Sequence, residues 1–304
     1  MQNRRDFIRK ASMMLTGGLV APQLLTLTSC GGGTKSASGG DAAAAATKNI
    51  GLQLYSLRDM VNEEGIQAVL EAVAKMGYKN LETAGYGNGK VYGLPPAEFK
   101  KMVTDLGMKC TSAHLGQSYT KEKDAEVMSW WDQAIDAHQQ LGVKYIIQPS
   151  MPVNDATTQD DLKMYCDYFA AVGYKTAAAS IAFGYHNHSF EFRKIGDQLI
   201  FDFLLDNVSK NHVCFELDVY WCQEGGGNPA AYLKDRPSQF KAVHIKDEKE
   251  IGASGKMDFK PIFDQMYANN IKDWYVEVEQ YTNNDPVASV QQSFDYLNKA
   301  DYVK

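Results

Sequence analysis

The sequence of 304 residues has no excess of positive charge, few cysteines and no glycine-rich nucleotide-binding turn. Its formal net charge is −6, and it becomes −9 without residues 1–29, which hold four of the 31 cations and one of the 37 anions. Such an acidic chain repels nucleic-acid phosphates and anionic membranes. With 44% hydrophobic and 22% charged residues, the composition also excludes a disordered, collagen-like or disulfide-rich protein.

Residues 1–29 are typical of an export signal. Four cations within residues 4–10 precede an uncharged run, and the pair Arg4-Arg5 resembles a twin-arginine signal. Gly17, Gly18 and Pro22 argue against a membrane-spanning helix in this run. The run ends in LTSC, which resembles the lipobox of bacterial lipoproteins. We therefore expect cleavage before Cys30, lipidation of its sulfur, and an exported protein that is periplasmic or anchored to a membrane only through this lipid.

The segment that follows is small and polar. Residues 30–48 contain almost nothing to bury, so we expect a flexible tether before a single domain over residues 49–304. The four remaining cysteines have no CxxC spacing and lie in apolar segments, which favours buried free thiols over disulfides. They are Cys110, Cys166, Cys214 and Cys222.

From residue 50 onward, short β-rich runs alternate with amphipathic helical stretches. A helix end, a glycine, any residue and a lysine recur before a strand, with the glycine at Gly77, Gly107 and Gly142. Glycine tolerates the left-handed conformation that ends a helix, so each copy marks a helix-to-strand junction. The predicted strands are 50–56, 79–84, 109–114, 144–149, 181–187, 213–219, 240–246 and 273–279. The clearest predicted helices are 64–76, 95–106, 123–141, 158–179 and 285–298.

Eight such units in about 255 residues predict a (β/α)8 TIM barrel, whose usual size is ~250 residues. A doubly wound sheet is the alternative, but no glycine-rich dinucleotide turn follows the first strand. The barrel places active groups at the carboxyl ends of its strands, on side chains that face the axis.

Polar side chains gather where the last four predicted strands end. Alternation along a strand puts each pair on one face. Buried imidazoles and carboxylates that converge on one axis require a cation, and this donor set suits Mn, Co, Zn, Fe or Ni better than Ca or Mg. The pairs are His186 with His188, Glu216 with Asp218, His244 with Lys246, and Glu277 with Glu279.

The other strands contribute polar groups that we predict to contact substrate, although each also has a purely structural explanation. Glu82 would cap a helix, for example, and Gln148 would satisfy backbone groups. Trp221 is expected to stack on the substrate. The predicted substrate-binding residues are Gln53, Tyr55, Arg58, Glu82, His114, Gln148, Glu216 and Trp221.

The segments LQLYSLRD, GYHNHSFEF, FELDVYW, AVHIKD and VEVEQY occur in that order across the predicted barrel. Together they resemble the sugar phosphate isomerase/epimerase group of xylose isomerase-like TIM barrels. The resemblance implies a divalent metal held by a Glu, an Asp, a His and a Glu on strands five to eight. Asp218, His244 and Glu277 occupy the last three positions, with Glu279 as a substitute for Glu277, and His186 stands where the epimerases have Glu.

The resemblance implies an isomerase or epimerase that removes a proton next to a carbonyl and stabilises the enediolate with a metal. The candidate catalytic groups are Glu277, His188, Glu191 and Lys246; His188 or Glu191 would replace the missing strand-five glutamate. The acidic charge and the lack of a phosphate cradle favour a neutral sugar or keto-sugar as the small-molecule carbohydrate substrate.

Three alternatives use the same fold. A 3-keto-glycoside lyase or hydrolase, or a keto-sugar dehydratase, would share the first proton transfer. A non-catalytic sugar-binding lipoprotein would have lost the reaction, as the absent glutamate allows. An abasic-site endonuclease needs a basic DNA-binding face, which the charge excludes. The sequence leaves the sugar, the metal and the oligomeric state open.

Overall fold

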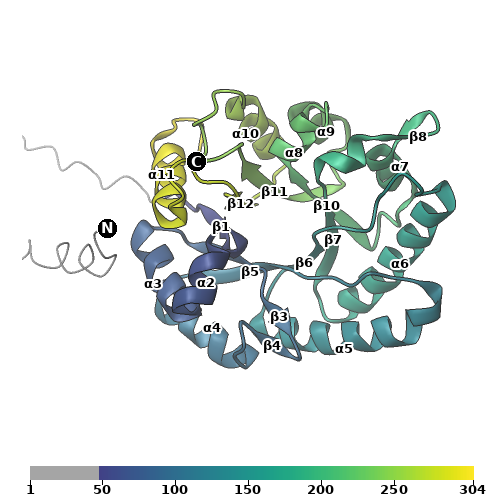
Figure 1. Cartoon of the computed structure of the whole chain (residues 1–304), viewed down its shortest axis with the longest axis horizontal. Helices are drawn as coiled ribbons and strands as arrows, with labels where there is room; N and C mark the ends of the chain where they lie inside the picture. The colour runs from purple at the N-terminus through teal and green to yellow at the C-terminus, as the bar shows by residue number, and fades with distance from the viewer. Residues whose placement is uncertain (1–47) are drawn as a thin grey trace, which may run out of the picture. The chain divides into compact units, whose positions relative to one another are not determined.

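The computed structural model describes residues 48–304, which contain a closed barrel of eight parallel strands (Figure 1). Each barrel strand pairs with the barrel strand that follows it in the sequence, and the last barrel strand pairs with the first. The strands are β1 (Gly51–Gln53), β2 (Asn80–Thr83), β5 (Lys109–His114), β6 (Tyr145–Gln148), β7 (Ala182–His186), β10 (Val213–Asp218), β11 (Phe240–Lys246) and β12 (Asp273–Glu277). The predicted TIM barrel is therefore confirmed.

Helices surround the barrel (Figure 1). They are α2 (Arg58–Glu64), α3 (Ile66–Met76), α4 (Pro96–Asp105), α5 (Asp124–Leu141), α6 (Gln159–Ala178), α7 (Ile200–Asn207), α8 (Val219–Glu224), α9 (Pro229–Asp235), α10 (Phe259–Ala268) and α11 (Pro286–Lys299). The first and last units of the barrel are neighbours: β1 pairs with β12, and the Tyr78 hydroxyl donates to the Val290 carbonyl of α11 at 2.9 Å.

Local signals explain where several helices begin and end. Helix α6 starts in a capping box, in which Thr158 Oγ1 accepts from the Asp161 N–H and Asp161 accepts from the Thr158 N–H. The glycines of the repeated junction adopt the predicted positive φ, with 107° at Gly77 and 85° at Gly142. These residues stop each helix and turn the chain into the next strand.

The structure departs from the predicted elements at the carboxyl ends of the strands. The sixth barrel strand ends at Asp218, and α8 begins at once because the Asp218 side chain caps it. A short helix, α2, precedes the predicted first helix and is separated from it by Gly65 at φ 84°. Two short hairpins, β3 (Tyr86–Gly87) with β4 (Lys90–Val91) and β8 (Lys194–Ile195) with β9 (Gln198–Leu199), were not predicted.

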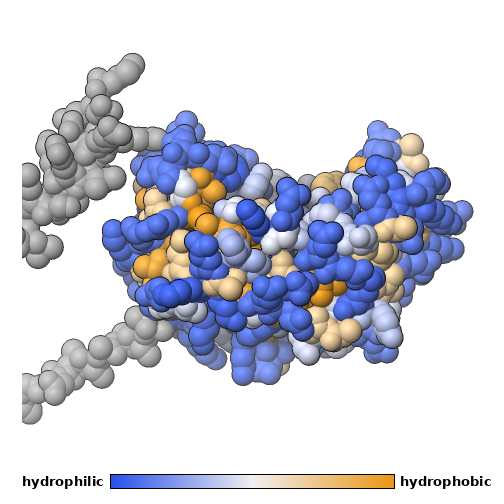
Figure 2. Space-filling model, turned by 90° about the horizontal axis from the view of Figure 1, so that it is seen from below, coloured by the Kyte–Doolittle hydropathy of each residue, from blue (hydrophilic) through white to orange (hydrophobic). Residues whose placement is uncertain are grey.

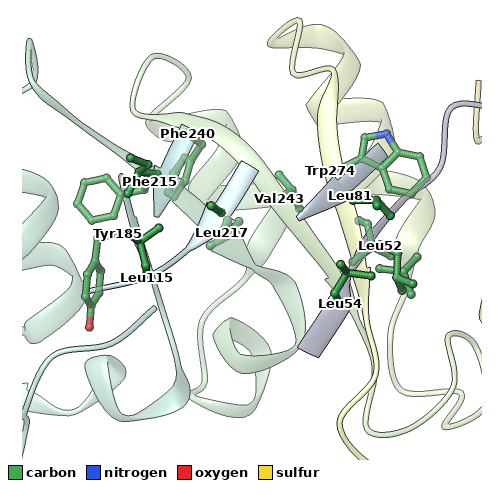
Figure 3. Packing of buried hydrophobic residues seen from close by; sticks show 14 of the residues in the cluster. Leu52, Leu54, Leu81, Leu115, Tyr185, Phe215, Leu217, Phe240, Val243 and Trp274 are labelled. Carbon is green, nitrogen blue, oxygen red and sulfur yellow. The ribbon is translucent and has the colours of Figure 1, made fainter. Parts of the chain in front are cut away.

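Apolar side chains fill the layer between the barrel and the helices. Figure 3 shows Leu52, Leu81, Leu217 and Val243 in this layer, and all four are fully buried. Each neighbours a polar residue on the opposite face of its strand, as strand alternation requires. The axis is thus left to polar side chains, and these form the candidate site.

The surface and the termini add little to this picture. Hydrophilic residues predominate on the face in Figure 2, with hydrophobic ones in small areas between them. None of the helices in the described part of the chain is both long and apolar enough to cross a membrane. The four cysteines of the barrel are buried and free, as predicted. The predicted signal, Cys30 and residues 30–47 of the predicted tether lie outside the described residues.

Helix α6 contacts the loop before β10 through a glycine. A Cβ added to Gly173 would lie 2.1 Å from the His212 carbonyl oxygen, which is backbone and has little freedom to move. We predict that Gly173→Ala displaces α6 and lowers the free energy of unfolding by about 1–3 kcal/mol. Urea denaturation measures this loss, and the exposed Ala171→Ser should change stability by less than about 1 kcal/mol. Equal stability of Gly173→Ala and wild type would contradict this packing.

Candidate metal centre

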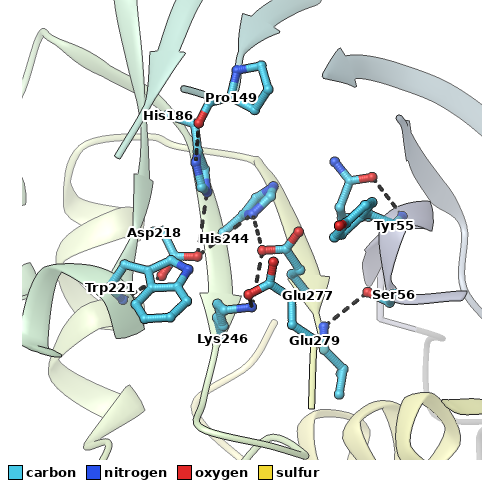
Figure 4. Close-up of polar contacts among 12 residues, drawn as sticks. Tyr55, Ser56, Pro149, His186, Asp218, Trp221, His244, Lys246, Glu277 and Glu279 are labelled. Carbon is cyan, nitrogen blue, oxygen red and sulfur yellow. Dashed lines mark hydrogen bonds and ion pairs between the residues drawn. The ribbon is translucent and has the colours of Figure 1, made fainter. Parts of the chain in front are cut away.

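Four buried side chains converge at the carboxyl ends of the last four barrel strands. We call His186, Asp218, His244 and Glu277 the outer cluster; their ligand atoms all lie within 4.8 Å of one another. His186 Nε2 is 3.5 Å from Asp218 Oδ2, and His244 Nδ1 is 3.4 Å from Glu277 Oε2. Figure 4 shows the four side chains directed toward one another. The structure thus brings together the four side chains that the sequence analysis predicts as metal ligands.

The end of β10 fixes the direction of Asp218. Its Oδ1 accepts from the Trp221 N–H at 2.7 Å, which caps α8. The Asn187 side chain accepts from the Asp218 N–H at 3.0 Å and donates to its carbonyl at 3.2 Å. Because these contacts hold the backbone and one carboxylate oxygen, Oδ2 is presented to the outer cluster.

Two atoms of the outer cluster have no hydrogen-bond partner although they are buried. They are His186 Nε2 and Asp218 Oδ2. An unpartnered buried polar atom costs free energy comparable to a lost hydrogen bond. Two imidazoles and two carboxylates form a donor set that binds divalent transition metals. The outer cluster therefore fits a metal ion.

A second group lies deeper along the axis. We call Glu82, His114, Glu216 and His244 the inner cluster, and it shares His244 with the outer one. Glu216 precedes Asp218 by two residues on β10, so it points to the same face one step lower in the barrel. His244 Nε2 is 2.6 Å from Glu82 Oε2, and His114 Nε2 is 2.6 Å from Glu216 Oε2. The structure thus places three predicted substrate-binding residues beneath His244.

Close charges lower the pKa of Glu82 and raise those of Glu216 and His244. Burial raises the pKa of Glu82, but His114 and His244 outweigh it and lower that pKa to about 2. Burial and the neighbouring Glu82 raise the pKa of Glu216 well above its usual range. Burial lowers the pKa of His244, yet Glu216, Glu82 and Glu277 together raise it well above its ordinary value. Without a metal, protons must therefore be shared among these groups.

Lys246 forms a buried ion pair at the mouth of the barrel. Its Nζ is 2.8 Å from Glu279 Oε2 and 3.3 Å from Glu277 Oε2. Burial lowers the pKa of Lys246, but the negative charges of Glu277, Asp218 and Glu279 have the larger effect and raise it above its ordinary value. The amine is therefore charged at neutral pH. Glu279 lies beyond the end of β12 and contacts Lys246. It is therefore a neighbour of the outer cluster and is not one of its four members.

His188 and Glu191 lie in the turn after β7. The chain leaves the strand at His186, yet the His188 ring remains 5.0 Å from the His186 ring, and its Nδ1 is buried without a partner. Burial lowers the pKa of His188 to about 3, with His186 adding to the effect. Both carboxylate oxygens of Glu191 are occupied, by the Tyr185 hydroxyl at 2.5 Å and the His188 N–H at 2.8 Å.

The remaining predicted residues divide between the rim and the wall of the barrel. Tyr55 is exposed, and Arg58 lies over its ring while donating to the Tyr281 hydroxyl and the Glu279 carbonyl. Gln53 donates to Glu82 Oε2 at 2.6 Å and therefore belongs to the surroundings of the inner cluster. Gln148 donates to the carbonyls of Gln117 and Ser150, which is the structural role already considered for it.

Trp221 lies at the rim between two candidate groups. The Lys246 amine is 5.7 Å from its ring, and the His188 ring is 6.0 Å from it. Its Nε1 is buried and has no hydrogen-bond partner. An indole N–H next to the outer cluster provides a donor for a bound hydroxyl.

Comparisons with known proteins agree with this geometry. The family model for the xylose isomerase-like TIM barrel matches residues 70–300. The chain belongs to this family. A sugar phosphate isomerase/epimerase from Parabacteroides distasonis is 40% identical, with a TM-score of 0.80 over 84% of this chain and 100% of that one. A second one from the same organism is 35% identical, with a TM-score of 0.79 over 89% and 100%.

A more distant solved structure, a 3-keto-D-glucoside 4-epimerase from E. coli, has the same fold as this protein. It is 20% identical, with a TM-score of 0.62 over 83% of this chain and all of that one. No protein with a curated function matches the sequence. This protein thus has the same barrel fold as sugar isomerases and epimerases, and its outer cluster has the composition of a metal site.

Sequence reasoning missed Asn187 and Tyr185, which hold Asp218 and Glu191 in place. Both lie in the same four-residue stretch as His186 and His188, so the only signal was their position at the end of a strand. Asn187 contacts Asp218 on β10, 31 residues away, and Tyr185 contacts Glu191 in the turn after β7, six residues away. Neither contact leaves a periodic pattern in the sequence.

Glu191 makes the free energy of unfolding of this protein depend on pH. Burial raises its pKa from 4.5 to about 8, so the folded state favours the protonated carboxyl. The stabilisation is complete below pH 4.5 and is lost as pH rises from there to 8, by at most about 1.4 kcal/mol per pH unit. We predict that Glu191→Gln, which imitates the neutral group, removes this decline in urea denaturation measured between pH 5 and 8. An unchanged slope would show that Glu191 is ionised when folded.

Proposed function

We propose that this protein is a divalent-metal-dependent enzyme that isomerises or epimerises a neutral sugar or keto-sugar. The observation that carries the proposal is the outer cluster, whose unpartnered His186 Nε2 and Asp218 Oδ2 face each other among four buried ligands. The similarity to two sugar phosphate isomerase/epimerases supports the same reaction class. His186, Asp218, His244 and Glu277 would hold the ion.

When bound, the metal supplies a Lewis acid that polarises a sugar carbonyl and lowers the cost of removing the neighbouring proton. Lys246 is charged and buried, and Glu277 and Glu279 engage two of its three N–H donors. The third would donate a hydrogen bond to the oxygen on which negative charge develops. Glu277 and the uncharged His188 are the groups placed to accept the proton. Glu191 positions His188 by accepting from its backbone N–H.

We favour a neutral substrate because most of the cations near the mouth are already engaged. Lys246 pairs with Glu277 and Glu279, and Arg193 pairs with Asp155. Lys256 pairs with Glu248, and Arg58 donates to carbonyl and hydroxyl groups of its own chain. A phosphate would have to break these contacts. The Trp221 ring and its unpartnered Nε1 instead suit a sugar ring with free hydroxyls.

One observation favours a second candidate function on the same site. His186 occupies the strand-five position at which the resemblance places a glutamate, so one of two opposed acid/base carboxylates is absent. A single proton acceptor suffices for elimination, in which a leaving group departs instead of a second proton transfer. The alternative is therefore a 3-keto-glycoside lyase or hydrolase, or a keto-sugar dehydratase.

The decisive experiment incubates the full chain and Mn²⁺ with 3-keto-glucosides and free ketoses in deuterated water. Deuterium incorporation next to the carbonyl without aglycone release is expected for the isomerase or epimerase. Aglycone release or an enone product would establish the elimination instead. Neither exchange nor product, together with no metal uptake, would leave a sugar-binding protein and overturn the enzyme proposal.

Two lysine variants provide a matched control for this experiment. We expect Lys246→Met to lower the exchange rate about 10²–10⁴-fold, since it removes a buried charged donor beside the ion. Lys256→Met removes an exposed lysine that pairs with Glu248, and the rate should stay within twofold of wild type. Equal rates for Lys246→Met and wild type would remove Lys246 from the reaction.

We also propose that the protein is exported and anchored through a lipid on Cys30. The support is the twin-arginine-like start, the uncharged run and the lipobox that ends at Cys30. Expression in a bacterial host with labelled palmitate should label the wild-type membrane fraction. Cys30→Ser should lose the label, whereas Cys110→Ser, at a buried barrel thiol, should keep it. Equal labelling of Cys30→Ser would disprove the anchor.

A further inference from the structure

The inner cluster has the composition of a second metal site. Two carboxylates and two imidazoles meet there, and the exposed fraction of Glu82, Glu216 and His244 is 0%. Besides the two contacts at 2.6 Å, His114 Nε2 is 3.1 Å from Glu82 Oε2 and His244 Nε2 is 3.1 Å from Glu216 Oε2. Nitrogen and oxygen therefore alternate around a closed ring of four atoms.

The spacing of this ring fits ligands of one ion. Atoms that each lie about 2.0–2.2 Å from a metal, at roughly 90–110° to each other, are about 3 Å apart. Four contacts of 2.6–3.1 Å are close to that separation. The same atoms are also within hydrogen-bond distance, so spacing alone does not decide between an ion and shared protons.

Charge favours the ion. An ion in the outer cluster is balanced by Asp218 and Glu277, and Lys246 is balanced by Glu279. Glu82 and Glu216 have no such cation, because no lysine or arginine of the described chain contacts either of them, so without an ion they depend on protons shared with His114 and His244. Within the described chain their partners are imidazoles, the Gln53 amide, the Ser112 hydroxyl and each other's carboxyl group. A divalent ion would neutralise both carboxylates at once.

Unpartnered atoms point the same way. Glu82 Oε1 and Glu216 Oε1 are buried and have no hydrogen-bond partner, although Oε2 of each carboxylate is crowded with contacts. A ring held by hydrogen bonds alone leaves both Oε1 atoms unsatisfied. Coordination by both oxygens of a carboxylate would satisfy them.

His244 stands between the two clusters with one ring nitrogen toward each. Its Nε2 faces Glu82 and Glu216, while its Nδ1 faces Glu277 and Asp218. A neutral imidazole has one lone pair, so a bond to an ion at each nitrogen requires loss of the ring proton. That proton leaves to solvent when the second ion binds, as metal binding generally displaces protons from its ligands.

We propose that Glu82, His114 and Glu216 hold a second divalent transition-metal ion in the floor of the barrel, and that His244 bridges it to the ion of the outer cluster. This inference rests on the outer ion assigned under the proposed function. The inner ion is shielded from substrate by the outer cluster. Its role is to fix the His244 ring and to neutralise the buried glutamates beneath the reacting atoms.

The experiment measures bound metal in the full chain. Metal-free protein is dialysed against Zn²⁺ and analysed by inductively coupled plasma mass spectrometry, with circular dichroism as the check on folding. We expect two ions per chain in wild type. His114→Gln and Glu82→Gln should each retain one ion, and so should the outer-cluster variant Asp218→Asn. In Co²⁺-loaded protein, magnetic coupling between the ions should be present in wild type and absent in these three variants.

The outcomes separate the two proposals. One ion in wild type that is lost in Asp218→Asn and kept in His114→Gln would overturn the inner site while leaving the proposed function intact. One ion lost in His114→Gln and kept in Asp218→Asn would overturn the outer assignment and the bridge. No bound ion in wild type would overturn both proposals. Two ions without magnetic coupling would reject His244 as the bridge.

Discussion

The barrel axis contains more buried charge than its side chains can neutralise among themselves. Glu82, Glu216, Asp218 and Glu277 are almost completely buried, and Lys246 is the one buried lysine beside them in the described chain. Ionised groups removed from water are strongly destabilising unless they are paired. The protein therefore needs protons or metal ions along its axis, and the arrangement of the site follows from this requirement.

The fold supplies the rigidity that such a site needs. Each charged group stands on a strand that is hydrogen-bonded on both sides, and its sequence neighbours pack under the helices. Asp218 combines three tasks at one position: it ends β10, caps α8 and presents Oδ2 to the cluster. A group that is constrained in this way cannot turn aside to relieve repulsion. Preorganisation at the axis and the need for a cation are therefore two consequences of the same packing.

The eight strands and the axis-facing side chains of the outer cluster were predictable because they depend on local patterns, whereas their predicted role as metal ligands came from the resemblance to the family. Alternation along a strand decides which side chains face the axis, and glycine marks the helix-to-strand junctions. The inner cluster was not predicted, since its ring joins β2, β5, β10 and β11, and the sequence does not show how far each side chain lies along the axis. The sequence predicts Glu82 and His114 as substrate contacts and gives no sign that they meet in one cluster. Glu191 likewise depends on Tyr185 and a backbone N–H, which no periodicity reveals.

The histidine at position 186 changes both the charge of the outer cluster and the number of its proton acceptors. A glutamate at this position would add a fifth carboxylate to the axis, and the histidine lowers the negative charge of the outer cluster by one. An ion held by the outer cluster would consequently be less neutralised by its ligands and would withdraw more electron density from a bound oxygen. The cost is one proton acceptor on the strand-five side, where the uncharged His188 is the nearest replacement. On the proposed function, a more electrophilic centre that keeps only one carboxylate base would favour loss of a leaving group over a second, opposed proton transfer. The histidine that lowers the negative charge on the axis would then also be the residue that keeps elimination in competition with epimerisation.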